Sequence, residues 1–157
     1  PFTFGKYVAS DKELIIQKVS NNYNLDTLIK QDFKDKLVLV DVWATWCAPC
    51  IKEFSYASSL HEYLDKKKVE LLYVSIDEKS SGNKWKKDLQ KYNLVGSHFF
   101  ATDSISYYLT EKLNTRLTIP RYLLFDKNGI LLDGNLPRPS SGNKLFNRID
   151  ELIKNEI

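Results

Sequence analysis

The feature that most constrains this chain is a pair of cysteines three positions apart, shortly after its most apolar segment. The run Leu37–Trp43 is rich in β-branched residues and only Asp41 interrupts it, which predicts a central strand covered on both faces. Cys47 and Cys50 follow, and apolar residues then recur at helical spacing for about four turns. The sequence therefore predicts a Cys-x-x-Cys pair at a strand-to-helix junction.

A Cys-x-x-Cys pair at the start of a helix has a definite chemical use. The helix N-terminus offers unpaired N–H groups and a partial positive charge, which stabilise a thiolate near neutral pH. Cys47 is the predicted nucleophile, and Cys50, one turn further in, is predicted to resolve the mixed disulfide. Pro49 fits the first helical turn, where a missing N–H does no harm.

Two other uses of the cysteine pair remain open at this point. A single Cys-x-x-Cys is half of a zinc site, and His61 and His98 are the only other soft ligands in the sequence. His61 falls on the predicted helix, about three turns beyond Cys50, which is too far for a tetrahedral site. We therefore interpret both histidines as structural and expect neither a metal nor a cofactor. The remaining alternative is a pair of idle core thiols.

Length and composition exclude several classes of protein. The 157 residues fit one domain, 1–157, and the absence of further cysteines excludes a disulfide-rich secreted scaffold. The net charge is +3 and the lysine clusters are short, which does not favour nucleic-acid binding. No segment is apolar for the ~18 residues of a membrane span. The chain begins at Pro1 and contains no Met, so we expect that a segment was removed from its front by processing or by design, and a signal or a lipid anchor is one candidate for that segment.

The remaining sequence predicts alternating strands and helices. Residues 1–10 show no clear period and are interpreted as an arm. The elements expected after it are a strand over 14–19, a helix over 25–33, the strand 37–43, the helix after Cys50, a strand over 69–76, a helix around 85–92, a short strand over 98–101, a helix over 103–113, a hairpin over 122–132 with an Asn-Gly turn, and a closing helix over 145–157. This order predicts an α/β sandwich with a mixed sheet.

Three segments resemble a known family. The run Leu39–Cys50 resembles the active-site strand and turn of thioredoxins, and its sequence is closest to that of the extracytoplasmic TlpA and ResA-like proteins. Ile119-Pro120 fits the cis-proline position of that family, and Asn135–Ser140 resembles a loop of the Bacteroidetes members. The resemblance implies a thioredoxin-like three-layer sandwich, with a core over 37–157 and an N-terminal extension over 1–36.

Two carboxylates are candidates for proton transfer. Asp41 lies in an apolar strand, where burial raises a carboxyl pKa and makes it a suitable base for the Cys50 proton. Its alternative is a strand-end aspartate bound to backbone. Glu78 resembles the buried active-site glutamate of the ResA-like branch, and its alternative is a plain polar strand end. Tyr73 occupies a position where many thioredoxins carry lysine.

A second group of residues is expected to bind substrate. Trp46, Ala48 and Pro49 flank the predicted nucleophile. Trp46 and Ile119 are expected to form an apolar patch around the sulfur, which suits a protein substrate. Ile119 and Pro120 are expected to present backbone groups to an extended substrate segment, through a cis bond. Arg121 follows them, and we expect it at the rim, where it would favour acidic partners.

These residues predict a reductase of disulfides in partner proteins. Ala48 and Pro49 add neither charge nor donor to the Cys47 thiolate, which does not favour a strong oxidant. The alternatives are a disulfide oxidase or isomerase on the same fold and a binding module without turnover. The resemblance implies a location outside the cytoplasm, electrons from a membrane protein and targets that include apocytochromes c. We expect a monomer, and no Cys-x-x-Cys-His haem motif is present, since Ile51 follows Cys50.

Overall fold

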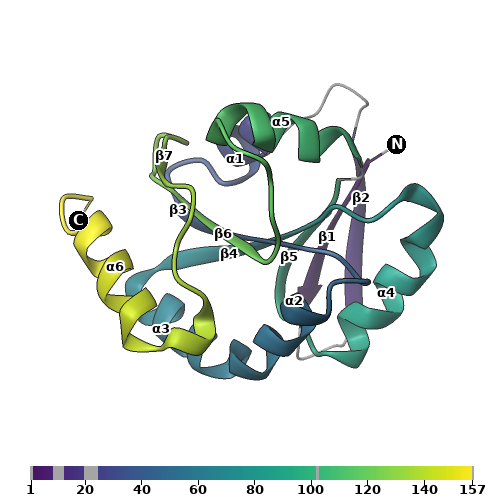
Figure 1. The fold of residues 1–157 in the computed structure, drawn as a ribbon, viewed down its shortest axis with the longest axis horizontal. Coiled ribbons are helices and arrows are strands. Elements are labelled where there is room, and N and C mark those ends of the chain that lie inside the picture. Colours follow the sequence, from purple (N-terminus) through teal and green to yellow (C-terminus); the bar gives the residue numbers. More distant parts are fainter. Residues whose placement is uncertain (1, 9–12, 20–24, 102, 157) are drawn as a thin grey trace.

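Seven strands form one sheet in the order β2-β1-β5-β4-β3-β6-β7 (Figure 1). The computed structural model describes residues 2–8, 13–19, 25–101 and 103–156. The strands are β1 (Phe2–Val8), β2 (Glu13–Val19), β3 (Leu37–Trp43), β4 (Val69–Ser75), β5 (Gly96–Phe100), β6 (Arg121–Phe125) and β7 (Leu131–Asp133). β3 pairs in parallel with β4 and antiparallel with β6, so the sheet is mixed, as predicted.

The expected arm over residues 1–10 is a strand wherever the structure describes it. β1 pairs antiparallel with β2 and with β5, which extends the sheet at one edge. Residues 1, 9 and 10 lie outside the described residues. The prediction was wrong because a neighbouring sheet edge supplies hydrogen-bond partners that the local residue pattern does not reveal.

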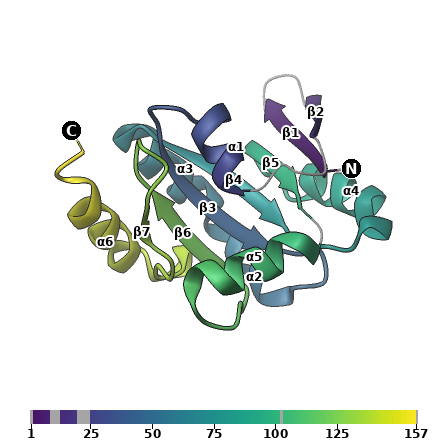
Figure 2. The same ribbon diagram turned by 90° about the horizontal axis from the view of Figure 1, so that it is seen from above.

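Helices cover both faces of the sheet and complete three layers (Figures 1 and 2). One face carries α1 (Leu25–Asp32) and α5 (Asp103–Leu113). The opposite face carries α2 (Ala48–Glu53), α3 (Ala57–Lys67), α4 (Gly82–Lys91) and α6 (Asn143–Ile153). No helix in the described part of the chain is both long and apolar enough to span a membrane.

The central strand β3 separates two hydrophobic cores. Every residue of β3 is buried, and alternate residues point to opposite faces. Leu37, Leu39 and Trp43 join the core beneath α2, α3, α4 and α6, which also contains both cysteines. The valines at 38, 40 and 42 join the core beneath α1 and α5. We call these the site face and the apolar face of the sheet.

Two local predictions differ from the structure. The helix after Cys50 is interrupted, because a 3-10 segment, Phe54–Tyr56, separates α2 from α3. The β6–β7 hairpin has a five-residue connection rather than a two-residue Asn-Gly turn. Asp126 Oδ1 accepts hydrogen bonds from the N–H groups of Asn128 and Ile130, and only Gly129 of this turn has a positive φ, of 76°. The aspartate side chain therefore organises this turn.

Candidate active site

Cys47 and Cys50 form a disulfide at the start of α2, with their Cα atoms 5.3 Å apart. Cys47 is the N-cap residue of this helix, and its Sγ accepts a hydrogen bond from the N–H of Cys50 at 3.2 Å. Pro49 lies in the first turn, as predicted. A donor aimed at Cys47 Sγ also stabilises negative charge on that sulfur once the pair is reduced.

Asp41 lies on the site face of β3, beside two tyrosines. Its register partners are Tyr73 on β4 and Tyr122 on β6. Asp41 is buried, and its Oδ1 has no hydrogen-bond partner among the described residues. Burial raises the pKa of this carboxyl well above its ordinary value, and the charge of Glu53 raises it further. The raised pKa makes the ionised carboxylate a stronger base toward the Cys50 thiol than an ordinary aspartate would be.

Glu53 is a site residue that the sequence reasoning missed. It lies three residues after Cys50 on α2, and its side chain is buried. Its Oε1 accepts a hydrogen bond from Ser140 Oγ at 2.6 Å and a longer one from the Ser140 N–H at 3.5 Å. The available signal was the spacing, because residues i and i+3 share a helix face. Glu53 therefore had to lie on the same side of α2 as Cys50.

The expectation that Glu78 is a buried glutamate was wrong. Glu78 is exposed and precedes the short 3-10 segment Lys79–Ser81, beyond the end of β4. The neighbouring Asp77 is the buried carboxylate of this loop, at 0% exposure. The chain turns away from the sheet after Asp77, so the side chain of Glu78 faces solvent rather than the cysteines.

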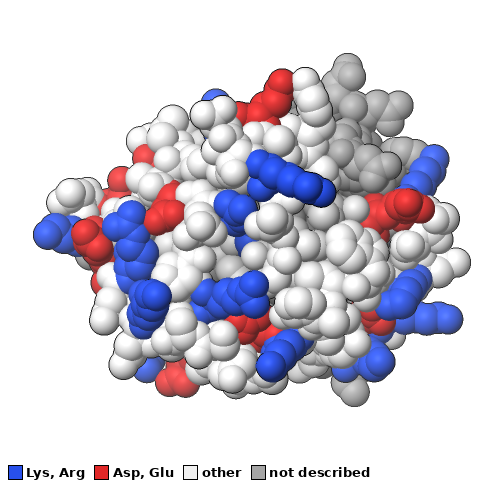
Figure 3. Space-filling view, in the orientation of Figure 1, with Lys and Arg blue, Asp and Glu red and all other residues white. Residues whose placement is uncertain are grey.

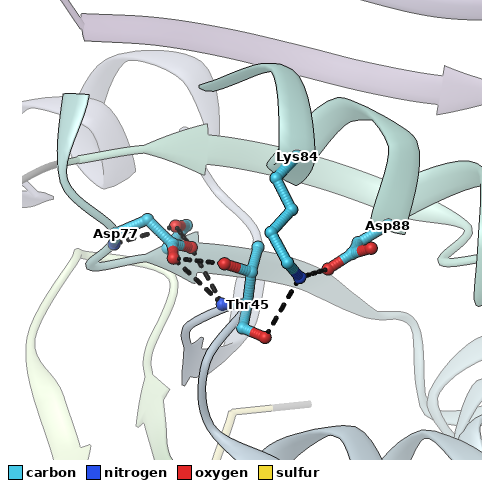
Figure 4. A network of polar contacts seen from close by, with 5 residues as sticks. Thr45, Asp77, Lys84 and Asp88 are labelled. Carbon is cyan, nitrogen blue, oxygen red and sulfur yellow. Dashed lines mark hydrogen bonds and ion pairs between the residues drawn. The ribbon is translucent and has the colours of Figure 1, made fainter. Parts of the chain in front are cut away.

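Two side chains hold the loop between β3 and Cys47 from opposite sides (Figure 4). The Asp77 carboxylate accepts hydrogen bonds from the Thr45 N–H at 3.0 and 3.1 Å and from Thr45 Oγ1 at 2.7 Å. The Lys84 Nζ donates to the Thr45 carbonyl oxygen at 3.4 Å and pairs with Asp88 at 2.8 Å. Both backbone polar groups of Thr45 are thus bound by side chains from other elements, which fixes the approach to the cysteine pair.

The residues predicted to bind substrate differ in their exposure to solvent. Trp46 is 65% exposed, and Ala48 and Pro49 are exposed beside it. Ile119 is half-buried and packs against both cores, whereas Pro120 is buried. The Ile119–Pro120 peptide bond is cis, which confirms that prediction.

Arg121 does not reach the rim, contrary to expectation. Its side chain is buried and donates hydrogen bonds to Thr118 Oγ1 at 3.0 Å, to the Thr118 carbonyl and to the Gly134 carbonyl. The guanidinium satisfies backbone acceptors near the start of β6. Arg121 therefore braces the loops around the cis peptide and is not available to an acidic partner.

A groove of about 550 Å³ adjoins the cysteine turn. Its lining joins α2 to the loop that carries Ser140, and consists of Ala48, Pro49, Lys52, Glu53, Tyr56, Arg138 and Ser140. Two cations, Lys52 and Arg138, therefore flank the single carboxylate Glu53. Figure 3 shows basic side chains spread over this view of the molecule with acidic ones between them, rather than one continuous basic patch.

The two histidines occupy a separate cluster on the site face. His98 is buried on β5, stacks on Tyr73 at 4.9 Å between ring centroids, and its Nε2 lies 2.8 Å from the Leu94 carbonyl oxygen. His61 Nε2 lies 3.4 Å from the Tyr73 hydroxyl. Among the described residues, no group of three or more His, Cys, Asp or Glu side chains is arranged to hold a metal ion. The packing assigns both histidines structural contacts.

Comparison with known proteins agrees with this architecture. Residues 16–149 match the Redoxin family. The chain belongs to the Redoxin family. It is 32% identical over 77 residues to the thiol-disulfide oxidoreductase ResA of Bacillus cereus, a match that covers 46% of this chain and 44% of that relative. It is 40% identical over 83 residues to ResA of Bacillus anthracis, covering 49% and 48%. The chain thus spans about half the length of these relatives.

Solved structures extend the similarity to nearly the whole chain. The thioredoxin domain of a thiol-disulfide oxidoreductase from Bacteroides vulgatus superimposes with a TM-score of 0.64 at 22% identity, over 98% of this chain and 94% of that one. A thiol-disulfide oxidoreductase from Bacteroides fragilis gives 0.59 at 20% identity, over 96% of each. The predicted thioredoxin-like α/β sandwich is confirmed.

Proposed function

We propose that this protein is a thiol–disulfide oxidoreductase that reduces disulfides in partner proteins through Cys47 and Cys50. The observation that carries the proposal is the cysteine pair itself. It forms a disulfide at the N-terminus of α2, where the Cys50 N–H donates a hydrogen bond to Cys47 Sγ. The buried carboxyl of Asp41 lies on the same face of the sheet. The relatives named as thiol-disulfide oxidoreductases support the same activity.

The first step uses the reduced pair. The Cys47 thiolate attacks one sulfur of the substrate disulfide, so that a Cys47–substrate bond forms and the second substrate sulfur leaves as a thiolate. The Cys50 N–H and the start of α2 lie against the attacking sulfur and stabilise it before the attack. Cys47 is therefore the nucleophile and should be alkylated before Cys50 in the reduced protein.

The second step releases the substrate. Asp41 takes the proton of the Cys50 thiol, and the Cys50 thiolate then attacks Cys47 Sγ. The Cys47–Cys50 disulfide forms, the bond to substrate breaks, and the substrate leaves with its two sulfurs reduced by two electrons. Glu53 acts on this step through Asp41, because its charge opposes ionisation of that carboxyl. A dithiol of a donor protein then returns two electrons to the pair.

Substrate binding is assigned to the surface around the cysteine turn. Trp46 and Pro49 offer exposed apolar area next to Cys47. The backbone of Ile119, beside the cis bond, is proposed to pair with an extended substrate segment. The adjoining groove, with Lys52 and Arg138 at its edges, receives side chains that flank the substrate cysteine.

Insulin reduction tests the activity. The wild-type protein should reduce insulin with dithiothreitol as donor, and Cys47→Ser should abolish that reduction. A Cys47→Ser variant that retained full activity would overturn the proposal. A folded wild-type protein that holds partners without turnover would instead be a binding module. The reduction potential then separates a reductase, at about −270 mV, from a strong oxidant, at about −120 mV.

The place of action follows from the resemblance to TlpA and ResA-like proteins. We propose that the protein works outside the cytoplasm as a monomer, in the periplasm or on a lipid anchor. We further propose that it receives electrons from a membrane protein and acts on targets that include apocytochromes c. A Cys50→Ala variant, which cannot resolve, should trap these targets as mixed disulfides in periplasmic extracts. Captured cytoplasmic proteins alone would contradict this location.

A further inference from the structure

The hydroxyl of Tyr122 is a buried polar group without a protein partner. Tyr122 is 1% exposed, and its hydroxyl accepts or donates no hydrogen bond among the described residues. Asp41 is the register partner of Tyr122 in β3, and its Oδ1 also has no hydrogen-bond partner among the described residues. Buried polar atoms in native proteins are nearly always satisfied by protein or by an ordered water molecule. Two such atoms on adjacent strands of one sheet face therefore call for a common explanation.

The groups around this hydroxyl set its protonation state. The groups that act on it electrostatically are Asp41 on β3, Glu53 on α2, Tyr73 on β4 and Arg138 in the loop before α6. Burial raises the pKa of Tyr122, the first three groups raise it further, and Arg138 opposes them. Tyr122 therefore keeps its proton at neutral pH and can act only as a hydrogen-bond donor toward a carboxylate.

The tyrosine on the other side of Asp41 provides an internal contrast. Tyr73 is the register partner of Asp41 on β4, as Tyr122 is on β6, and both rings are buried on the site face. The Tyr73 hydroxyl, however, lies 3.4 Å from His61 Nε2. Of the two tyrosines that flank Asp41, only Tyr122 has a hydroxyl left for the carboxyl group.

We propose that Tyr122 is a positioning residue for Asp41: its hydroxyl donates a hydrogen bond, through a buried water molecule, to Asp41 Oδ1 during the resolving step. The inference rests on the proposed function, in which Asp41 takes the proton of Cys50. The proton moves from Cys50 Sγ to the Asp41 carboxylate, and the Cys50 thiolate attacks Cys47. Tyr122 keeps its own proton throughout.

A hydrogen bond to the carboxylate has a predictable effect on the reaction. Such a bond favours the ionised form of Asp41 and so offsets part of the burial penalty. Without it, less Asp41 is ionised at neutral pH, and Cys50 loses its proton more slowly. The pH at which resolution reaches half its maximal rate should therefore rise, while the attack by Cys47 should not change.

The test compares Tyr122→Phe with Tyr73→Phe, a matched removal of one hydroxyl on either side of Asp41. The reduced protein is mixed with 5,5′-dithiobis(2-nitrobenzoic acid), which forms a mixed disulfide at Cys47, and the release of the second thionitrobenzoate reports resolution by Cys50. We expect Tyr122→Phe to raise the midpoint by about one pH unit and to slow resolution roughly tenfold at neutral pH. Tyr73→Phe should leave both values close to those of the wild type.

Two further measurements separate this role from a structural one. Thermal denaturation should show that Tyr122→Phe is as stable as the wild type, because the lost hydroxyl has no protein partner. The Asp41 carboxyl carbon, followed by NMR in the labelled protein, should titrate at higher pH in Tyr122→Phe and not in Tyr73→Phe.

An unchanged Asp41 titration in Tyr122→Phe would overturn the inference, and so would equal slowing in the two variants. Failure of the proposed function is distinguishable from both outcomes. If the wild-type protein neither reduced insulin nor released thionitrobenzoate from Cys47, the proposed function would be contradicted. The NMR titration would still decide whether Tyr122 acts on Asp41.

Discussion

The two faces of β3 carry opposite kinds of core. On the apolar face, Val38, Val40 and Val42 pack against the aliphatic and aromatic side chains of α1, α5 and the neighbouring strands. On the site face, the same strand places Asp41 between Leu39 and Trp43, in the core that holds the cysteines. Both faces are buried, but the carboxyl of Asp41 lies within the strand on the site face, where burial raises its pKa.

The two faces of β3 are therefore expected to contribute differently, the apolar face to stability and the site face to the proposed reaction. A purely apolar core contributes a hydrophobic stabilisation that does not depend on protonation. A core with buried titratable groups gives up part of its stability and becomes sensitive to pH. The redox chemistry proposed for the cysteine turn uses such a group in Asp41, whereas the apolar face contains the valines of β3. The comparison predicts different responses when residues on either face are changed.

The largest effect on stability is expected on the apolar face. Leu123 on β6 is fully buried there, next in sequence to Tyr122. Leu123→Ala should lower the free energy of unfolding by about 3 kcal/mol through lost burial and a cavity. Urea denaturation at pH 5 and pH 8 should give the same loss, and insulin reduction per folded molecule should be unchanged. A strongly pH-dependent loss would break the proposed division between the faces.

His98 should make the stability of the site face pH-dependent. Burial lowers its pKa to about 4 from 6.5, with a smaller opposite contribution from the hydrogen bond to the Leu94 carbonyl. The unfolded chain therefore binds more protons between these values, and stability falls as the pH drops from about 6.5 to 4. The shift corresponds to a loss of about 3 kcal/mol once the pH falls below the folded pKa of about 4.

Denaturation of the wild type and of His98→Gln between pH 7 and 4 checks this expectation. Glutamine retains a side-chain donor near Leu94 but does not titrate, so the variant should lose less stability over this range. Equal slopes in the two proteins would assign the pH dependence to other groups.

Asp41→Asn should slow resolution about 100-fold, the effect of losing a general base. The first attack by Cys47 should change far less, because it does not use this carboxyl. Stopped-flow measurement of both steps tests the claim, with Asp133→Asn, at a carboxylate paired with Arg148, as the control. Unchanged decay of the mixed disulfide would leave Asp41 with a structural role only.

The same variant should also alter stability, with a sign set by the raised pKa. In the folded protein Asp41 holds its proton to higher pH than in the unfolded chain, so its contribution is lost as the pH rises through the folded pKa. Asparagine stays neutral. Asp41→Asn should therefore be more stable than the wild type at pH 8 and similar to it at pH 4, as chemical denaturation would show.

The smallest effect on stability is expected from the two side chains that hold the loop between β3 and Cys47. Asp77→Asn keeps one carbonyl acceptor for Thr45 but loses a charged oxygen and should cost about 1–2 kcal/mol. Asp88→Asn, on the Lys84 side of the same loop, is the matched control and should cost less, because its ion pair is partly exposed. Thermal melts rank the two. A larger loss of stability in Asp88→Asn would mean that the Lys84 side, and not Asp77, contributes more to holding this loop.

Local sequence determined the elements with a strong and self-contained signal. The apolar run 37–43, the cysteine spacing and the helical period after it are short-range patterns, so they place Cys47 and Cys50 at a strand-to-helix junction without tertiary information. Asp41 also stood out, because a carboxyl within such a strand is buried in any fold that covers both faces. The cis bond before Pro120 came instead from the resemblance to thioredoxins.

Tertiary structure decided what no local pattern contains. Residues 2–8 became a strand because β5 and β2 offered them partners. Glu53, not Glu78, is the buried glutamate, and Ser140, 87 residues later in the chain, supplies its hydrogen bonds. The groups that act electrostatically on the Tyr122 hydroxyl come from two other strands, a helix and a loop. Burial and electrostatics depend on which distant segments meet, and that is the part of this site that the sequence alone does not contain.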